Sequence, residues 1–589
     1  MFSLIHHSDP DKRKAFLSGY EAAPSPRLNS KKEHLTYQDT LIAWESAPHI
    51  PVHTHQEANG VQVWVLGHIE DLDAEANPAE FLFKHYTESG HEGCAGYSGF
   101  FVFILLDGDN LIAGTDQLGL FPAYYYQSGD CFVLGSSPAT PHMLPGISME
   151  PDIHGIIGIL LAMHELDNRS VWSGVRRIPA DKILHINRHR LELLSGASLP
   201  VSDEHFSLPF ESHVDIADEA MTAAMQKHRE IDLLLSGGLD SRLVSAYLNR
   251  SSITPRKCYT MGKTTDIEWK CAHPVVRYLG SVHEQVPVNF DNYERYIRMQ
   301  VSQEQLSNGL ADVNWWSLAD LPRNKPMLPL MNGFFGDAIL GGSHMPWALN
   351  LKERNWSANN LFDSVNEWGV DIETIKGIHN KDVTDTIDEM VNIVKNTYNG
   401  FPGYPYQKSW QYDLRNRQRY HIGGFLCRAA YNFWPAVPYT SNVILKCAGG
   451  MPAASIMQRR IQKELLRREF PKLAALPLDN NSLSPQALSP SVPRRIISKL
   501  KNYIPSKERD IRSFCYYHRV FNIENPGWRP LFEQRINIDK DKTNSDIVDR
   551  QKIGRIFSSI FDKDRDYDMI GDVSYKNLLG LYLWLEENF

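Results

Sequence analysis

The stretch that decides the fold is Ile231-Asp232-Leu233-Leu234-Leu235-Ser236-Gly237-Gly238-Leu239-Asp240-Ser241. An apolar run of strand length stops at Ser-Gly-Gly, and residues 242–248 continue with helical spacing. The pattern predicts a buried strand that passes through a tight turn into a helix. Two glycines let backbone N–H groups approach a polyanion closely, and a helix N-terminus adds partial positive charge.

The side chains of this turn indicate a nucleotide. Ser236 and Ser241 carry hydroxyls that donate to phosphate oxygens, whereas Asp240 suits a Mg²⁺ ion that the phosphates share. The spacing differs from the Walker-type loop, and no lysine follows the glycines. A plain glycine turn explains the glycines but not the placement of Ser, Asp and Ser. The turn resembles the pyrophosphate loop of enzymes that split ATP into AMP and pyrophosphate.

Composition limits the class of protein. A chain of 589 residues should form two or more domains, and 42% hydrophobic with 22% charged residues is ordinary for a soluble protein. A net charge of -9 argues against a nucleic-acid partner. The longest apolar run, 155–163, is too short to span a membrane, and the first residues lack the features of a signal peptide. Seven scattered cysteines without a C-x-x-C pair favour reduced thiols and a cytoplasmic location.

The chain divides into two halves with different patterns. Residues 1–205 are rich in predicted strands, and from 206 strands alternate with helices, which predicts a parallel sheet. Roughly the last 170 residues favour helices, interrupted by a Ser/Pro-rich segment, 480–507, that we expect to be a mobile loop. The clearest elements of the first half are strands at 61–66, 99–106, 111–114 and 132–134 and a helix at 77–86.

Several motifs of the first half resemble the glutaminase domain of asparagine synthetases. They are Gly96-Tyr97-Ser98-Gly99-Phe100-Phe101-Val102-Phe103, Asp107, the run 113–125, and 170–179 at the junction of the two halves. The chain is therefore similar to the asparagine synthetase-like group, which includes β-lactam synthetases and lasso peptide cyclases. The resemblance implies an α/β fold. Residues 1–205 would form an Ntn-hydrolase-like αββα sandwich of the class II glutaminase type. Residues 206–589 would form a Rossmann-like synthetase domain of the adenine nucleotide α-hydrolase type, with a helical C-terminal part.

The resemblance also implies a site for ATP and Mg²⁺ in the second half. Asp240 and Asp337 would bind Mg²⁺ and serve as the catalytic carboxylates, the latter within Met331-Asn332-Gly333-Phe334-Phe335-Gly336-Asp337. The implied nucleotide-binding residues are Leu235, Ser236, Gly237, Gly238, Asp240, Ser241, Met261, Asn332 and Gly333, the last two through backbone groups.

The first half lacks two parts of a working glutaminase. Relatives use an N-terminal Cys thiolate, and this chain has Phe2 at that position. The Asn of the relatives' oxyanion segment is replaced by Leu66, whose side chain has no donor. We therefore expect an inactive domain. A rival hypothesis, metal binding by His53 and His55 or by His6 and His7, has no third ligand nearby in sequence.

The second half departs from the relatives at the positions where they handle the acyl acceptor, which is the attacking amine. Phe334 stands where asparagine synthetases have Glu and β-lactam synthetases have Tyr, and Phe transfers no proton. The run 434–438 keeps only the end of the relatives' Glu-Val-Arg-x-Pro segment, and 476–481 lacks their lysine. These changes predict an acceptor that is larger or less polar than ammonia.

Two basic runs remain to be placed. Arg415, Arg417 and Arg419, which His421 follows, would spread over different faces of one helix. We expect one or two of the three arginines to meet a phosphate or carboxylate and the rest to face solvent. A second run predicts a solvated or peptide-binding helix face, and it consists of Arg459, Arg460, Lys463, Arg467 and Arg468.

Three functions follow from these features. The first is an ATP-dependent, AMP-forming carbon–nitrogen ligase that joins an amine of its own substrate to an adenylated carboxylate, as in a lasso peptide cyclase. Its implied partners are a precursor peptide, a leader-removing protease and a leader-binding protein. The second is an amidating synthetase that uses free ammonia or a separate glutaminase on a small-molecule or sugar-acid carboxylate. The third is a non-catalytic nucleotide-binding scaffold, against which Asp240 and Asp337 argue.

Overall fold

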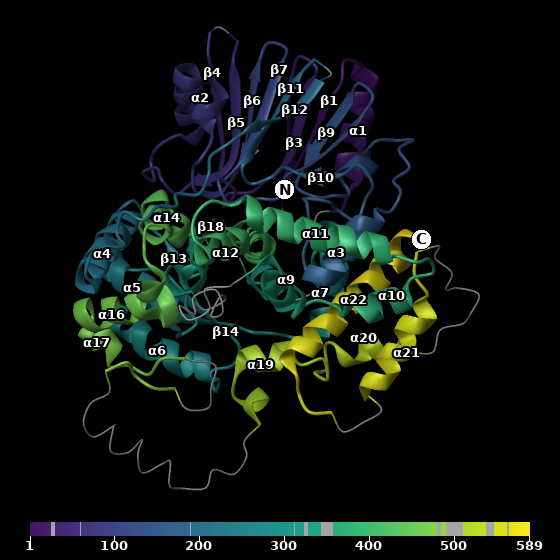
Figure 1. The fold of residues 1–589 in the computed structure, drawn as a ribbon. Helices are drawn as coiled ribbons and strands as arrows, with labels where there is room; N and C mark the ends of the chain where they lie inside the picture. The colour runs from purple at the N-terminus through teal and green to yellow at the C-terminus, as the bar shows by residue number, and fades with distance from the viewer. Residues whose placement is uncertain are drawn as a thin grey trace.

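The N-terminal half is built from two antiparallel sheets of six strands each (Figure 1). The computed structural model describes residues 1–24, 30–58, 60–188, 190–310, 312–322, 328–342, 357–479, 485–489, 510–536, 547–561 and 565–589. One sheet has the order β10-β8-β9-β1-β3-β2, with bounds Arg176–Arg177, Tyr124–Ser128, Cys131–Gly135, Phe2–His6, Thr40–Ser46 and Lys31–Tyr37. The other has the order β12-β11-β7-β6-β5-β4, with bounds Arg190–Ser195, Lys182–Asn187, Asn110–Thr115, Gly99–Asp107, Gln62–Ile69 and Val52–Gln56.

The two sheets face each other and carry one helix on each outer face. Alternation along the strands sends Leu4 and Val102 into the space between the sheets, since successive side chains point to opposite faces. Ile5 points outward against α1, Pro10–Ala22. Val63 points outward against α2, Pro78–Ser89, whose N-cap Asn77 accepts from the Ala79 amide at 2.9 Å. The predicted αββα sandwich is confirmed, as are its predicted strands and helix.

The second half contains the predicted parallel sheet. Its order is β15-β14-β13-β17-β18, with bounds Val282–Val286, Lys257–Met261, Asp232–Leu234, Leu330–Met331 and Pro435–Ala436, and all four pairings are parallel. The chain leaves β13 through α5, Leu239–Arg250, to β14 on one side, and β17 lies on the other side of β13. This reversal creates a crevice at the carboxyl ends of β13 and β17, the usual ligand position in such sheets.

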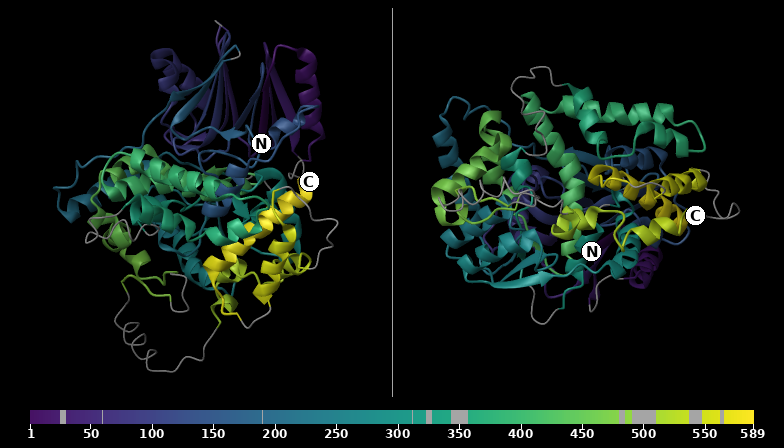
Figure 2. Two further views of the ribbon diagram at one scale, coloured as in Figure 1. Left: turned by 45° about the vertical axis from the view of Figure 1, so that its right-hand side comes forward. Right: turned by 90° about the horizontal axis from the view of Figure 1, so that it is seen from below.

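Helices make up most of the described C-terminal part, as predicted (Figure 2). They include α11 Thr384–Gly400, α13 Arg419–Ala429, α16 Arg460–Glu469, α19 Tyr516–Phe521 and α22 Met569–Asn588. Among the described residues, none of the helices has the length and apolar character needed to cross a bilayer. The segment expected to be a mobile loop, 480–507, lies outside the described residues except for 485–489.

The two halves share a continuous core. Trp434, 1% exposed, places its ring centroid 5.6 Å from that of Phe100 and 6.4 Å from that of Phe121. Helix α3, Ile153–Ala162, belongs to the first half of the sequence but packs with α22, and Asn577 donates to the Ile159 carbonyl at 2.9 Å. The domain boundary at 205 and 206 stays a prediction.

Two arginines expected on a solvated face are instead buried between the halves. Arg419 donates to the Gly119 carbonyl at 3.1 Å and to Asn168 Oδ1 at 2.6 Å. Arg415 donates to the Ala197 carbonyl at 2.7 Å. The expectation was wrong for both, because a π-helical turn at Leu414–Gln418 directs this segment against the first half. Of the three arginines, Arg417 alone lines the pocket described below.

Candidate active site

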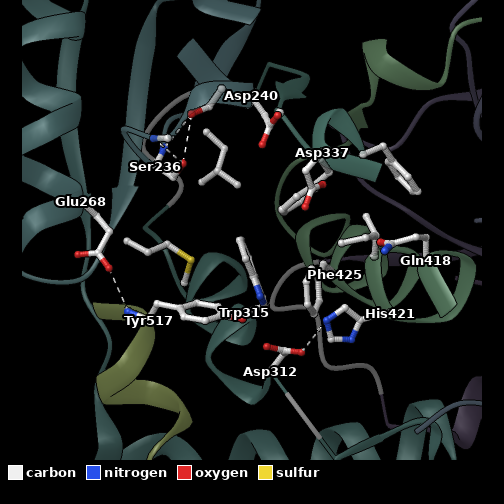
Figure 3. A pocket seen from close by; sticks show the side chains of 18 of the residues that line it. Ser236, Asp240, Glu268, Asp312, Trp315, Asp337, Gln418, His421, Phe425 and Tyr517 are labelled. Carbon is white, nitrogen blue, oxygen red and sulfur yellow. Dashed lines mark hydrogen bonds and ion pairs between the residues drawn. The ribbon is translucent and has the colours of Figure 1, made fainter. Parts of the chain in front are cut away.

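A pocket of about 750 Å³ opens at the carboxyl ends of β13, β14 and β17 (Figure 3). Its size is within the usual range for small-molecule sites. In Figure 3 the Ser236–Asp240 turn lies along one side, and Asp312 with His421 lies along the other. The wall contains the predicted residues Leu235, Ser236, Gly238, Asp240, Ser241, Met261, Gly333 and Asp337.

The turn after β13 has the geometry of an anion-binding loop. Gly237 has φ +81°, and a Cβ there would lie 2.7 Å from the Cys271 Cβ, so only glycine fits. Ser236 Oγ lies 3.2 Å from Ser241 Oγ and accepts from the Gly238 amide at 3.2 Å. Helix α5 then begins without a side-chain cap, which leaves its first N–H groups and its dipole directed at the pocket.

Two carboxylates lie beside this turn and share one arginine. Arg459 Nη1 is 3.0 Å from Asp240 Oδ2, and Arg459 Nη2 is 3.5 Å from Asp337 Oδ2. Gln462 donates to Asp240 Oδ1 at 2.7 Å. Burial, and to a lesser degree the charge of Asp337, raise the pKa of Asp240 to about 6, although Arg459 opposes the shift.

This donor set fits Mg²⁺ bound together with a polyphosphate. Mg²⁺ prefers oxygen ligands and is usually held by one or two carboxylates plus phosphates and waters. Asp240 and Asp337 supply those two carboxylates. Within the described residues, no group of three or more His, Cys, Asp or Glu side chains is placed to hold a metal ion. The pair would therefore bind the ion through its nucleotide.

Close backbone approach fixes the second predicted loop against α5. A Cβ on Gly333 would lie 2.5 Å from the Ser241 nitrogen, and one on Gly336 would lie 2.7 Å from Asp240 Oδ1. The side chain of Asn332 is used within the fold, since it donates to the Ala436 carbonyl at 2.9 Å and accepts from the Phe334 amide at 3.1 Å. Asn332 and Gly237 are the two predicted site residues that do not line the pocket in the described structure.

A further wall comes from a segment that sequence analysis did not place. Tyr516 and Tyr517 of α19 line the pocket, and Tyr516 Oη lies 3.5 Å from Met261 Sδ. Glu268 holds this segment by accepting from the Tyr517 amide at 3.1 Å. These contacts span some 250 residues of sequence, so no local pattern indicated them.

Aromatic rings line the part of the pocket around Phe334. Phe334 packs edge-on against Trp315 at a centroid distance of 5.3 Å, and Trp315 stacks on Phe425 at 5.0 Å. His421 contacts Phe425 at 4.6 Å and places Nε2 3.4 Å from Asp312 Oδ2. This part of the pocket has an apolar floor and one titratable pair at its edge.

Arg459 lies in the pocket and not on the solvated helix face that its spacing predicted. The basic run was expected to be a solvated or peptide-binding face, but Arg459 contacts both carboxylates and Lys463 also lines the pocket. A kink causes the difference: Gln458 has φ +54° and Arg459 φ +59°, so Arg459 precedes α16 instead of continuing its face.

The first half offers no activated thiol among its cysteines. Burial raises the pKa of Cys94 to about 12 and that of Cys131 to about 11. Phe2 is 1% exposed and packs on Trp64 at 5.6 Å, and Leu66 is also buried. All seven cysteines of the chain are buried and free.

Comparison with known protein families agrees with this arrangement. The asparagine synthase family profile matches residues 215–478, and the glutamine amidotransferase domain profile matches residues 74–195. The chain is therefore similar to the first family over part of its second half and to the second family over part of its first half. The Ser236–Ser241 turn, Asp337 and Arg459 all fall within the segment that matches the asparagine synthase profile.

Individual relatives are distant. The glutamine-hydrolyzing asparagine synthetases of Cricetulus griseus and Mus musculus are 27% identical over 229 residues, and that of Bos taurus is 27% identical over 225 residues. Each match covers 36% of this chain and 39% of the relative's length.

Two solved structures also match. One is the glutamine phosphoribosylpyrophosphate amidotransferase from B. subtilis complexed with ADP and GMP, with a TM-score of 0.22 and 11% identity, covering 48% of this chain and 65% of that one. The other, described as the allosteric regulatory enzyme of purine biosynthesis, has a TM-score of 0.24 and 10% identity, covering 48% and 80%.

Proposed function

We propose that this protein is an ATP-dependent, AMP-forming ligase that adenylates a carboxylate and couples it to an amine. The observation that carries the proposal is the Ser236–Ser241 turn with Asp240 and Asp337 beside it, at one end of a single pocket. A scaffold that only binds a nucleotide would not need two carboxylates beside the phosphates.

The residues of the pocket have separate roles in adenylation. The substrate carboxylate attacks the α-phosphorus, and the bond to the bridging oxygen breaks so that its electron pair leaves with pyrophosphate. The N–H groups at the start of α5 and the hydroxyls of Ser236 and Ser241 bind the departing phosphates. Mg²⁺ held by Asp240 and Asp337 would neutralise part of their charge. Arg459, which lies beside both carboxylates, would face the same phosphates.

The second proposal concerns the amine, which we place in the substrate itself. Cys94 and Cys131 are buried thiols, and Phe2 and Leu66 are core residues, so the first half contributes structure and not ammonia. Phe334, Trp315 and Phe425 suit an organic amine better than ammonia. The reaction would be macrolactam formation in a ribosomal peptide, as in a lasso peptide cyclase, with a precursor peptide, a leader protease and a leader-binding protein as partners.

The amidating synthetase that uses free ammonia or a separate glutaminase stays the alternative. It would act on a small-molecule or sugar-acid carboxylate. The aromatic lining of the acceptor side gives it less support than the peptide reaction.

The test is exchange of labelled pyrophosphate into ATP with a panel of linear peptides, each with a free N-terminal amine and one internal Asp or Glu. We expect exchange by the wild type and a loss of at least about 10²-fold in Asp240→Asn. Asp215→Asn is the matched control, because Asp215 pairs with Arg468 on the surface at 2.8 Å. Loss of one water from the peptide without added ammonium supports the peptide reaction. A product that forms only with ammonium supports the alternative, and absence of any exchange refutes adenylation.

A further inference from the structure

The pocket contains a second charged site, remote from the carboxylates that would bind Mg²⁺. Asp312 and His421 both line it, with Oδ2 and Nε2 3.4 Å apart. The Asp312 side chain is 4% exposed and the His421 side chain 34% exposed. Asp312 Oδ2 accepts no hydrogen bond within the described residues, which is costly for a buried carboxylate oxygen. In Figure 3 the pair lies across the pocket from Ser236 and Asp240.

Asp312 is held in place by its backbone. It has φ +59°, a left-handed conformation that Asp and Asn adopt more readily than most residues. Arg428 donates to the Asp312 carbonyl at 3.2 Å and is itself clamped by Glu304 at 2.7 Å through two nitrogens. These contacts use the main chain and leave the carboxylate directed at the pocket.

The surroundings of Asp312 raise the pKa of its carboxyl group. Burial is the largest cause that raises the pKa of Asp312 to about 6, and Glu304 adds to it. Arg428, Lys576 and Arg417 oppose the shift. A carboxylate whose pKa is raised in this way is a better proton acceptor than an ordinary carboxylate.

Aromatic rings form the floor beside this pair. Trp315 and Phe425 stack with their planes 23° apart, and Phe334 closes the third side at 5.3 Å from Trp315 and 5.8 Å from Phe425. Ring faces next to a buried carboxylate attract an alkylammonium ion through both the ring quadrupole and the charge. They have no group that recognises a second carboxylate or a phosphate.

We propose that Asp312, His421 and the Trp315–Phe334–Phe425 floor form the site that binds and deprotonates the attacking amine, a primary alkylamine. This inference rests on the ligase activity proposed above. Phe334 cannot transfer a proton. The Asp312–His421 pair, which comes from two other parts of the chain, would perform that role.

The proton balance is closed within the pocket. The amine nitrogen forms a bond to the acyl carbon of the adenylate, and the bond from that carbon to the phosphate oxygen breaks, so AMP leaves with the electron pair. The alkylammonium ion loses two protons on the way to the amide. The Asp312–His421 pair accepts the first before attack, which frees the lone pair of the nitrogen, and it accepts the second after the bond to the acyl carbon has formed. The partly exposed His421 releases each proton to water in turn.

If the Asp312–His421 pair only stabilised the fold, its loss would lower all three rates measured below in parallel. If the pair deprotonates the amine, its loss would lower amide formation alone. The variants are Asp312→Asn, which keeps the left-handed backbone acceptable, and His421→Gln. The control is His154→Gln, since His154 pairs with Glu389 at 2.9 Å and does not line the pocket. For each protein three rates are measured with the peptide that supports exchange: pyrophosphate exchange, loss of water from the peptide, and formation of its hydroxamate with hydroxylamine. Hydroxylamine serves as the probe because it is already largely unprotonated at neutral pH, so no base is needed to make it nucleophilic before attack.

We expect both variants to lose peptide amide formation by about 10²-fold or more. Their exchange and hydroxamate rates should stay within about threefold of the wild type, and the control should match the wild type in all three. Equal amide formation in variants and wild type overturns this inference but leaves the proposed ligase activity standing. Parallel loss of all three rates in both variants assigns the pair a structural role and also overturns it. Absence of exchange in the wild type overturns the proposed ligase activity, and this inference with it.

Discussion

Arg459 and Asp240, 219 residues apart in sequence, form an ion pair of 3.0 Å beside the Ser236–Ser241 turn. The same guanidinium reaches Asp337 at 3.5 Å, so one cation bridges the two carboxylates that the sequence motifs identify. A cation this close to the predicted phosphate position would also be able to bind anionic oxygens of the nucleotide.

Replacement of Arg459 by Ala should slow adenylation. A charged donor directed at developing phosphate charge contributes about 10²–10³ in rate, and we expect a loss of that order in pyrophosphate exchange. Arg460→Ala is the control, since Arg460 stacks on Phe210 at 3.8 Å and does not line the pocket. An exchange rate in Arg459→Ala above half that of the wild type would contradict this role.

Local sequence predicted the strand, the tight turn and the helix that follow one another from residue 231, but not the side chains that surround the turn. The turn and Asp337 lie in short motifs whose glycines are required by close backbone contacts, such as that of Gly333 with Ser241. Arg459 and the Asp312–His421 pair are brought to the pocket by the tertiary fold, over 219 and 109 residues. Helical spacing placed Arg459 on a solvated face because the left-handed residues 458 and 459 have no signature in sequence.

Gly237→Ala should disrupt the turn. At φ +81° an added Cβ would lie 2.7 Å from the Cys271 Cβ and 2.9 Å from the Ala272 nitrogen, so strain and overlap add. We expect a loss of about 2–4 kcal/mol in the free energy of unfolding and weaker binding of the analogue α,β-methylene-ATP with Mg²⁺. Denaturant titration and calorimetry measure the two effects.

The control for Gly237 is Gly280→Ala. Gly280 has φ +73°, but its Cβ would meet nothing within 4 Å, so only the strain term applies. Its cost should be about 1 kcal/mol, without an effect on nucleotide binding. Equal costs at the two positions would show that the close approach of Gly237 to Cys271 and Ala272 is unimportant.

Glu165 should make stability depend on pH. The residue is fully buried, and burial raises the pKa of its carboxyl group to about 8 despite the charges of Arg177 and Arg419. The folded pKa lies above the unfolded value near 4.5, so the stabilisation is complete below about pH 4.5 and is lost as pH rises through 8. Glu165→Gln stays neutral and should remove this slope.

We therefore expect Glu165→Gln to gain at least about 1 kcal/mol over the wild type at pH 8 relative to pH 5. Urea unfolding at pH 5, 6.5 and 8 measures the difference. Glu373→Gln, at a side chain that is 84% exposed, should leave the wild-type slope unchanged. If the difference in the free energy of unfolding between Glu165→Gln and wild type did not change with pH, Glu165 would be ionised in the folded protein and the prediction would be wrong.

Trp434→Ala tests whether the two halves depend on each other for stability. The indole is 1% exposed and contacts Phe100 and Phe121, which belong to the sheets of the first half, while its neighbours Pro435 and Ala436 form β18 of the parallel sheet. Truncation of a buried Trp costs about 3–5 kcal/mol, and here the cavity would open between the halves. We expect a lower urea midpoint together with faster proteolysis at the junction of the halves.

Trp269→Ala is the control, because Trp269 stacks on His283 at 3.6 Å and is only partly buried. If Trp434→Ala costs no more than Trp269→Ala, the shared core is not what joins the halves, and the buried contacts of Arg419 with Gly119 and Asn168 become the principal link between them.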